Sequence, residues 1–169
     1  FDTAQSRAMS KFIAPEDLVV PYEASDLSSA ERVTHVLNMS RNEIKKQQLS
    51  GFYADVELKG GSVNVSRNEV EEEIDEIEGV EPSYQEDRDR VVLETHTILD
   101  IAGYEDLGED GEPTGLKLPY IVTIDEGSSK VLSIRRNYVE GDPLKNKINY
   151  FVQYKFLPGL GFYGLGLSH

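Results

Sequence analysis

Val91-Val92-Leu93-Glu94-Thr95-His96-Thr97-Ile98-Leu99-Asp100-Ile101 is rich in β-branched residues, which favour strands because a branched Cβ packs well on a pleated surface. Similar runs follow at residues 116–125, 130–138 and 148–156. The links between these runs are too short for the helical crossovers that parallel strands require. The second half of the chain is therefore predicted to form an antiparallel β-meander.

The first half of the chain carries three capping boxes, in which a serine is followed three residues later by a glutamate. This pattern satisfies backbone N–H groups at a helix N-terminus. Apolar residues at helical spacing follow each box, so we expect several short helices between residues 26 and 79, with a short strand at 52–58 between two of them. The three boxes are Ser28 with Glu31, Ser40 with Glu43, and Ser66 with Glu69.

Together, the two halves predict an α+β fold, in which a mostly antiparallel β-meander from the C-terminal half packs beside several short helices from the N-terminal half. We expect one domain over residues 1–169, and we expect it to be a fragment of a longer chain. Its predicted parts are an extended arm at 1–25, a helical part at 26–79, a β-rich part at 91–157 and a Gly-aromatic segment at 158–169 that leads into a further region.

Composition narrows the classes of function. The chain has 169 residues with 17 Lys+Arg against 31 Asp+Glu, a formal net charge of −14. This charge repels phosphate backbones, so a protein that reads DNA grooves is disfavoured. The absence of cysteine excludes disulfide frameworks, thiol nucleophiles and cysteine-ligated metals.

Much of the excess negative charge lies between Glu69 and Arg90, where eleven acids stand against two arginines. Val70, Ile74 and Ile77 lie at helical spacing, so we expect a helix over 67–78 with one apolar edge and an acidic remainder. The ordinary role of such a helix is to present a solvated face. The acidic surface is predicted to contain Glu71, Glu72, Glu73, Asp75 and Glu76.

Two binding motifs are superficially present. The two capped segments at 28–51 suggest a helix-turn-helix, but any two adjacent capped helices match that pattern, and the net charge is adverse. Residues 105–112 are dense in oxygen ligands, as calcium loops are. If Gly111 took the glycine position of an EF-hand loop, Gly108 and Lys117 would occupy ligand positions, so a solvated turn is favoured.

No constellation of catalytic residues is recognisable, so no catalytic residue, metal ligand or cofactor is predicted. The three histidines are His35, expected in a helix, His96, expected in a strand, and His169. His96 could face a cleft, although a surface position on the sheet is the more ordinary interpretation. Arg135 and Arg136 are adjacent on a predicted strand and should point to opposite faces.

The segment from Pro158 to Gly166 alternates glycines with large apolar residues but lacks the lysine of a P-loop and the spacing of a dinucleotide-binding turn. Glycines allow close approach of backbones, so we interpret the segment as a contact with a neighbouring subunit or a further part of the chain. The predicted contact residues are Leu160, Phe162, Tyr163 and Leu165.

The C-terminal third of the sequence resembles portal proteins of tailed bacteriophages, particularly those of short-tailed phages and related prophages. The resemblance extends to earlier stretches and so covers most of the chain. The stretches that carry it are KVLSIRRNY at 130–138, YFVQYKFLPGLGFYGLG at 150–166, EDLVVPY at 16–22, ERVTH at 31–35 and SGFY at 50–53.

The resemblance implies a structural protein without enzymatic activity that forms a dodecameric ring at one capsid vertex. Double-stranded DNA would pass through this ring without sequence-specific binding during packaging and ejection. The implied partners are further copies of the chain, capsid or scaffolding protein, and the terminase, with no membrane. The implied location is the virion, and the host cytoplasm during assembly.

The chain is too short for the channel-lining helices and the terminase-binding clip of that family, so it would be part of the peripheral wing. Two alternatives remain open at the level of sequence. The first is an acidic protein–protein interaction module of another multi-subunit assembly. The second is an enzyme that uses carboxylates, which would require two acids to converge in one pocket.

Overall fold

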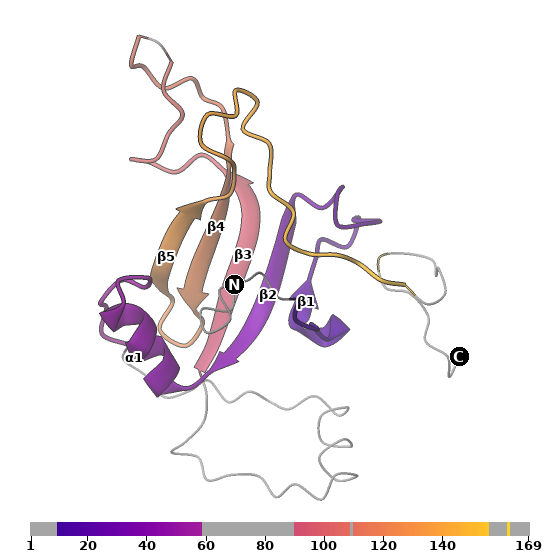
Figure 1. Cartoon of the computed structure of the whole chain (residues 1–169), viewed down its shortest axis with the longest axis vertical. Helices are drawn as coiled ribbons and strands as arrows, with labels where there is room; N and C mark the ends of the chain where they lie inside the picture. Colours follow the sequence, from indigo (N-terminus) through magenta and orange to yellow (C-terminus); the bar gives the residue numbers. More distant parts are fainter. Residues whose placement is uncertain (1–9, 59–89, 109, 156–161, 163–169) are drawn as a thin grey trace, which may run out of the picture.

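The computed structural model describes residues 10–58, 90–108, 110–155 and 162. These residues form one five-stranded antiparallel sheet with the strand order β1-β2-β3-β4-β5, together with one α-helix (Figure 1). In the same residues, no helix has the length and apolar character that crossing a membrane requires. The elements are η1 (Pro15–Asp17), β1 (Leu18–Val19), β2 (Arg32–Met39), α1 (Arg41–Leu49), β3 (Arg90–Leu99), β4 (Leu118–Asp125) and β5 (Lys130–Arg136).

The predicted α+β class is wrong, because the described chain is mostly β with a single α-helix instead of several helices beside a meander. The residues that follow the first capping box form strand β2. All eight residues of β2 pair with β3, from Arg32 opposite Thr97 to Met39 opposite Arg90. This long-range ladder outweighs the local helical spacing. The helix expected at 67–78 lies outside the described residues.

Helix α1 confirms the second capping box. The Ser40 hydroxyl accepts a hydrogen bond from the Glu43 N–H at 3.2 Å, and the Glu43 carboxylate accepts one from the Ser40 N–H at 3.0 Å. The helix is followed by Gly51 at φ 76°, a left-handed conformation that glycine adopts without strain. Ile44 is the one residue of α1 that is buried, so it anchors the helix to the sheet.

Strands β3, β4 and β5 confirm three of the predicted strands and their antiparallel order. A bulge between Thr123 and Ile124 places Leu132 as the extra residue of β5, and Leu132 is fully buried. The predicted strand at 52–58 is absent, although Ala54 donates one backbone hydrogen bond to Leu132 at 2.7 Å. Residues 148–155 also belong to no strand, which corrects the fourth predicted strand over the part that is described.

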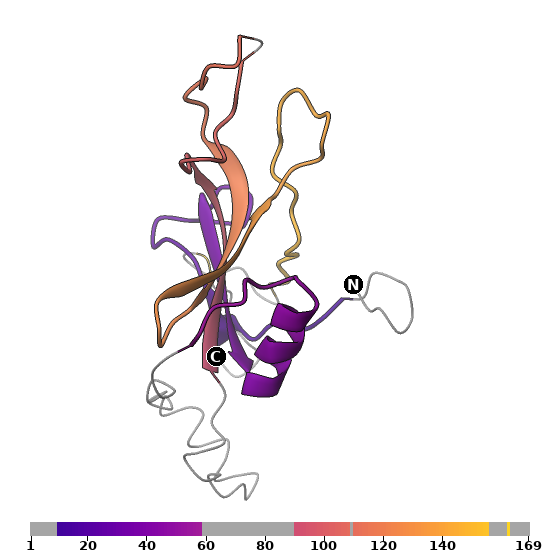
Figure 2. The same cartoon turned by 90° about the vertical axis from the view of Figure 1, so that its left-hand side faces the viewer.

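Helix α1 lies on one side of the sheet, here called the helix face (Figure 2). Two apolar clusters occupy this face. The first joins α1 to the end of the strands that is lower in Figure 1, and it contains Ile44, Tyr53, Val92 and Leu132. The second surrounds Val33 at the other end of β2 and includes Leu18 and Phe151.

Candidate functional site

A polar cluster lies between the two apolar clusters of the helix face, and Glu94 is at its centre. Side chains alternate along β3, so Glu94 and His96 point to the same side. The ladders place His35 of β2 directly opposite Glu94, and Arg135 of β5 opposite Ile121, which in turn pairs with His96. Three strands therefore deliver two imidazoles, one guanidinium and one carboxylate to the same region.

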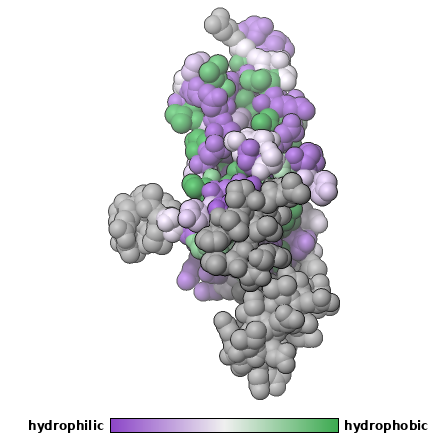
Figure 3. All heavy atoms as spheres, turned by 90° about the vertical axis from the view of Figure 1, so that its right-hand side faces the viewer, coloured by the Kyte–Doolittle hydropathy of each residue, from purple (hydrophilic) through white to green (hydrophobic). Residues whose placement is uncertain are grey.

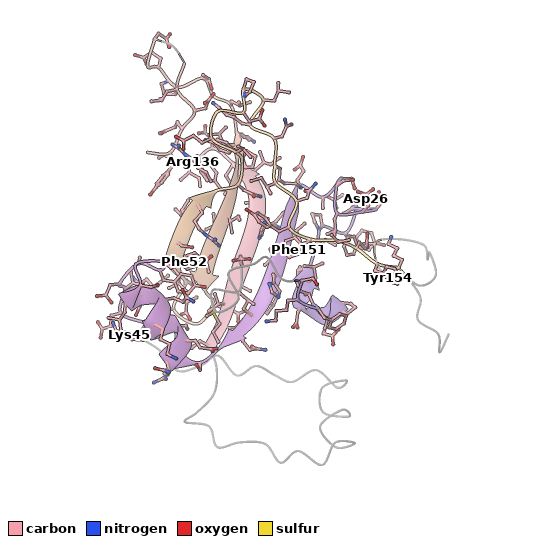
Figure 4. All side chains as sticks on the ribbon, in the orientation of Figure 1. Asp26, Lys45, Phe52, Arg136, Phe151 and Tyr154 are labelled. Carbon is pink, nitrogen blue, oxygen red and sulfur yellow. The ribbon has the colours of Figure 1, made fainter. Side chains whose placement is uncertain are left out.

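The Glu94 carboxylate is engaged on both oxygens. His96 Nε2 lies 3.3 Å from Oε1, and Arg135 Nη2 donates to Oε2 at 3.0 Å. The hydrogen bond from His96 and the charge of Arg135 hold the pKa of Glu94 below its usual range. The Arg135 guanidinium also lies 4.5 Å from the centroid of the Phe52 ring, in cation–π contact (Figure 4). The cluster thus links β3 to β5 and leaves neither carboxylate oxygen without a partner.

His96 is buried, so the surface position favoured from the sequence is wrong. Its ring centroid lies 4.8 Å from that of Phe151 and 5.7 Å from that of Tyr150, both in edge-to-face geometry. These two aromatic residues cover the histidine from a segment that is distant in sequence. His35 lies in β2 instead of the predicted helix, and burial lowers its pKa.

The covering segment, residues 147–155, is here called the strap. On the helix face it passes in front of β2 and continues toward the side of β1 (Figure 1). Lys147 Nζ donates to the Ala30 carbonyl at 3.1 Å, and the Ile148 N–H donates to the Asn137 carbonyl at 3.0 Å. Beyond these ties Phe151 packs inward, while Val152 and Tyr154 are more than nine-tenths exposed. Tyr154 extends away from the sheet in Figure 4.

A groove of about 310 Å³ separates the strap from residues 10–22, which are part of the predicted extended arm at 1–25 and are here called the arm. Most of the described residues that line it are apolar, and Phe12, Leu18 and Phe151 are among them. Among the described residues that line it, the charged side chains are Lys11 and Lys155, and none is acidic. Figure 3 views the molecule from this side, where apolar and hydrophilic side chains are interspersed on the coloured surface.

Phe162 is the one predicted contact residue that the structure describes. It is buried and lines the groove, its carbonyl accepts a hydrogen bond from Gln153 Nε2 at 2.8 Å, and its ring lies 5.9 Å from Lys155 Nζ. Its side chain is therefore held within the chain. The other predicted contact residues and the predicted acidic surface lie outside the described residues; they are Leu160, Tyr163, Leu165, Glu71, Glu72, Glu73, Asp75 and Glu76.

Residues 104–108 and 110–116 belong to a hairpin-like loop, here called the acidic hairpin, that projects beyond the sheet (Figure 1). Asp106 is bound by the Thr114 hydroxyl at 2.7 Å and by the Lys145 ammonium group. The calcium-loop pattern therefore has one of its oxygen ligands occupied by a lysine. Within the part of the chain that is described, no group of three or more acidic or histidine side chains could hold a metal ion.

The helix-turn-helix interpretation fails, because its first helix is strand β2. Arg135 and Arg136 do lie on opposite faces, as predicted: Arg135 pairs with Ile121 and Arg136 with Tyr120.

Comparisons with protein-family models, curated proteins and solved structures found no match to this chain.

Sequence reasoning predicts a solvated turn at the acidic hairpin but misses the strap as an exposed surface, because residues 148–156 are expected to form a strand of the sheet. Val152 and Tyr154 alternate with Phe151 and Gln153, a period of two that leaves one side of the extended segment exposed. Leu107 is an apolar residue among acids, and it is 59% exposed. The apolar residue among acids is visible in the sequence, whereas the exposed side of the strap is not, because the inward side chains are one phenylalanine and one glutamine. Only the fold shows that no described part of the chain covers the exposed side chains.

Proposed function

We propose that this chain is a structural domain of the portal protein of a tailed bacteriophage, placed in the peripheral wing of the ring through which double-stranded DNA is packaged and ejected. The resemblance of its sequence to that family motivates the proposal. Its role in the ring is to make contacts with neighbouring copies and with capsid or scaffolding protein. DNA would pass through the same assembly without sequence-specific binding.

The observation that carries a contact role is the exposure of large apolar side chains on the arm and the strap. Phe12, Tyr22, Val152 and Tyr154 are each at least 85% exposed. Phe12, Val152 and Tyr154 all line the arm–strap groove, and apolar side chains gathered on one part of a surface are typical of protein–protein contacts. Phe12 and Tyr22 lie outside β1, and Val152 and Tyr154 belong to no strand, which suits side chains that rest against another protein.

The polar cluster supports a structural role in place of a catalytic one. Both oxygens of Glu94 accept hydrogen bonds from cationic or imidazole groups, and aromatic residues of the strap cover His96. A general acid or base needs an oxygen or nitrogen directed toward a substrate. Here the Glu94 oxygens bind Arg135 and His96 instead, which joins β3 to β5, and the His96 ring packs against the strap.

The experiment that tests this function is negative-stain electron microscopy of the full-length protein that contains the chain. Rings with a central channel are the expected result. Monomers at high protein concentration would overturn the portal assignment and leave the acidic interaction module, which the same exposed side chains favour. In cells that also produce the capsid and scaffolding proteins, we expect the ring to be incorporated into capsids.

A further inference from the structure

The acidic hairpin and the arm–strap groove have complementary properties, although they lie on different parts of the molecule. Among its described residues the hairpin carries four acids and no basic residue, whereas Lys11 and Lys155 are the charged residues among the described groove lining. The four acids are Glu105, Asp106, Asp110 and Glu112. The described lining of the groove is therefore opposite in charge to the chain as a whole, whose net charge is −14. Opposite charge on two surfaces favours their association and suppresses wrong partners.

The hairpin also carries apolar side chains that match the walls of the groove. Leu107 and Leu116 are 59% and 50% exposed. The groove presents Phe12, Leu18 and other apolar residues, and its volume of about 310 Å³ leaves room for an inserted side chain. Leu107 lies near the tip of the hairpin, so it is the residue best placed to enter.

Hydrogen bonds join the two sides of the acidic hairpin within its described residues. The Thr114 N–H donates to the Asp106 carbonyl and the Gly108 N–H donates to the Glu112 carbonyl, both at 2.9 Å. Leu107 and Pro113 form an isolated antiparallel bridge, and Lys145 binds Asp106 from the neighbouring loop. A preorganised segment loses little conformational entropy when it binds.

The two surfaces cannot meet within one copy. The hairpin projects beyond the upper end of the sheet in Figure 1, whereas the strap and the arm lie beside β1 and β2 on the opposite side of the molecule. The ion pair between Lys145 and Asp106 holds the hairpin at its own end. An apolar residue on one part of a molecule that fits a pocket elsewhere on the same molecule produces a head-to-tail contact between copies.

We propose that the acidic hairpin of one copy of this chain docks into the arm–strap groove of a second copy, with Leu107 inserted between Phe12 and the strap. The contact is head-to-tail, so it generates a ring when its rotation closes and a filament when it does not. The closure of this contact into a ring rests on the proposed function. The contact between two copies does not, because both surfaces belong to this chain.

Cysteine cross-linking tests the contact directly, because the chain has no cysteine of its own. Leu107→Cys and Val152→Cys proteins are mixed and oxidised mildly. We expect a disulfide-linked heterodimer in the mixture, since a disulfide forms only when the two Cα atoms come within about 7 Å. Leu49→Cys mixed with Val152→Cys is the control, because Leu49 is exposed but belongs to neither surface. Yields that do not exceed this control would overturn the proposal.

Charge reversal provides a second test that does not depend on oxidation. Glu112→Lys and Lys11→Glu should each weaken self-association about two- to fivefold in sedimentation equilibrium, the range expected for an exposed ion pair. The two variants mixed together should associate through the restored pair of opposite charges. If the mixture associates no better than either variant alone, the docking arrangement is wrong.

These outcomes separate the contact from the portal function. Cross-linking at the level of the control in a full-length protein that forms rings would overturn the contact and retain the function. Strong cross-linking in a protein that forms only filaments or dimers would support the contact and overturn the ring. Circular dichroism of each variant shows that the fold is retained.

Discussion

The guanidinium of Arg90 binds the carboxylate of Asp125 through two hydrogen bonds, from Nε to Oδ1 at 2.7 Å and from Nη2 to Oδ2 at 2.6 Å. The two side chains are 3% and 0% exposed, so this ion pair is shielded from water. Arg90 begins β3 and Asp125 ends β4, and Asp125 also accepts two hydrogen bonds from Ser128 in the following turn. The pair therefore joins the start of β3 to the β4–β5 hairpin.

Removing one member of this pair should be costly. Asp125→Asn removes the negative charge that accepts two hydrogen bonds from the buried Arg90 guanidinium, so we expect the free energy of unfolding to fall by about 3–5 kcal/mol. Urea denaturation at pH 7 measures this loss. The matched control is Asp55→Asn, which breaks an exposed ion pair with Lys45 at 3.1 Å and should cost less than about 1 kcal/mol. Equal losses of unfolding free energy in the two variants would show that the buried Arg90–Asp125 pair stabilises the fold no more than an exposed ion pair does.

Helix α1 depends on Ile44 for its attachment to the sheet. Ile44→Ala should lower the free energy of unfolding by about 2–5 kcal/mol, because it leaves a cavity beside Val92 and Leu132. Leu49→Ala on the same helix removes a side chain that is 78% exposed and should change stability by less than about 0.5 kcal/mol. Thermal and urea unfolding of both variants measure the difference. A small effect of Ile44→Ala would contradict the packing of α1 on this face.

Stability should fall as the pH is lowered through the range in which histidine titrates. Burial lowers the pKa of His35 below its ordinary value of 6.5, so the unfolded chain binds a proton at a higher pH than the folded chain. The stabilisation that comes from keeping His35 neutral is complete above about pH 6.5, and it is lost as the pH falls through the pKa of His35 in the folded chain. His35→Gln should reduce the loss between pH 7 and pH 5 in urea titrations. An unchanged pH profile would exclude His35 as its cause.

Asp26 should titrate far below an ordinary aspartate. Its carboxylate accepts hydrogen bonds from the Ser28 hydroxyl at 2.6 Å and from the Ser29 N–H at 2.7 Å, and these lower its pKa to about 2. Ser28→Ala removes the largest contribution and should move the pKa toward 3.8. Carboxyl-carbon NMR titration measures both values. A pKa near 3.8 in the unsubstituted chain would show that this turn does not form in solution.

The strap should matter for assembly more than for folding. Val152→Asp with Tyr154→Asp places two charges on side chains that are more than nine-tenths exposed, so the isolated chain should keep its stability. In the full-length protein, the same substitutions should reduce the fraction of particles that are rings. Val131→Asp, an exposed apolar position on β5, is the control. Phe162→Asp is a poor probe of assembly, because Phe162 is buried within the chain.

The sequence predicts the parts of this fold that local chemistry determines. The Ser40–Glu43 capping box acts over one helical turn, and it correctly gives the start of α1. The β-branched runs of β3, β4 and β5 are joined in sequence order, so their antiparallel pairing also follows from pattern. The opposite orientations of Arg135 and Arg136 follow from the alternation of a strand.

The errors arise where distant residues decide the structure. Val33, Val36 and Leu37 fit the spacing of a helix, yet Val33 and Leu37 also lie on one face of a strand. Pairing with the full length of β3 selects the strand, and nothing near β2 in the sequence signals that partner. Residues 148–155 show the converse, because strand-forming residues remain outside the sheet. The Glu94–His96–Arg135 cluster likewise depends on the register of three strands.

Native mass spectrometry of the full-length protein is the sharpest test of the proposal that this chain belongs to a ring-forming portal protein. We expect one discrete closed oligomer, the dodecamer that the family resemblance implies, with its mass unchanged on dilution. A protein that remains monomeric at all concentrations, or that gives an open series of increasing sizes, would contradict the proposal.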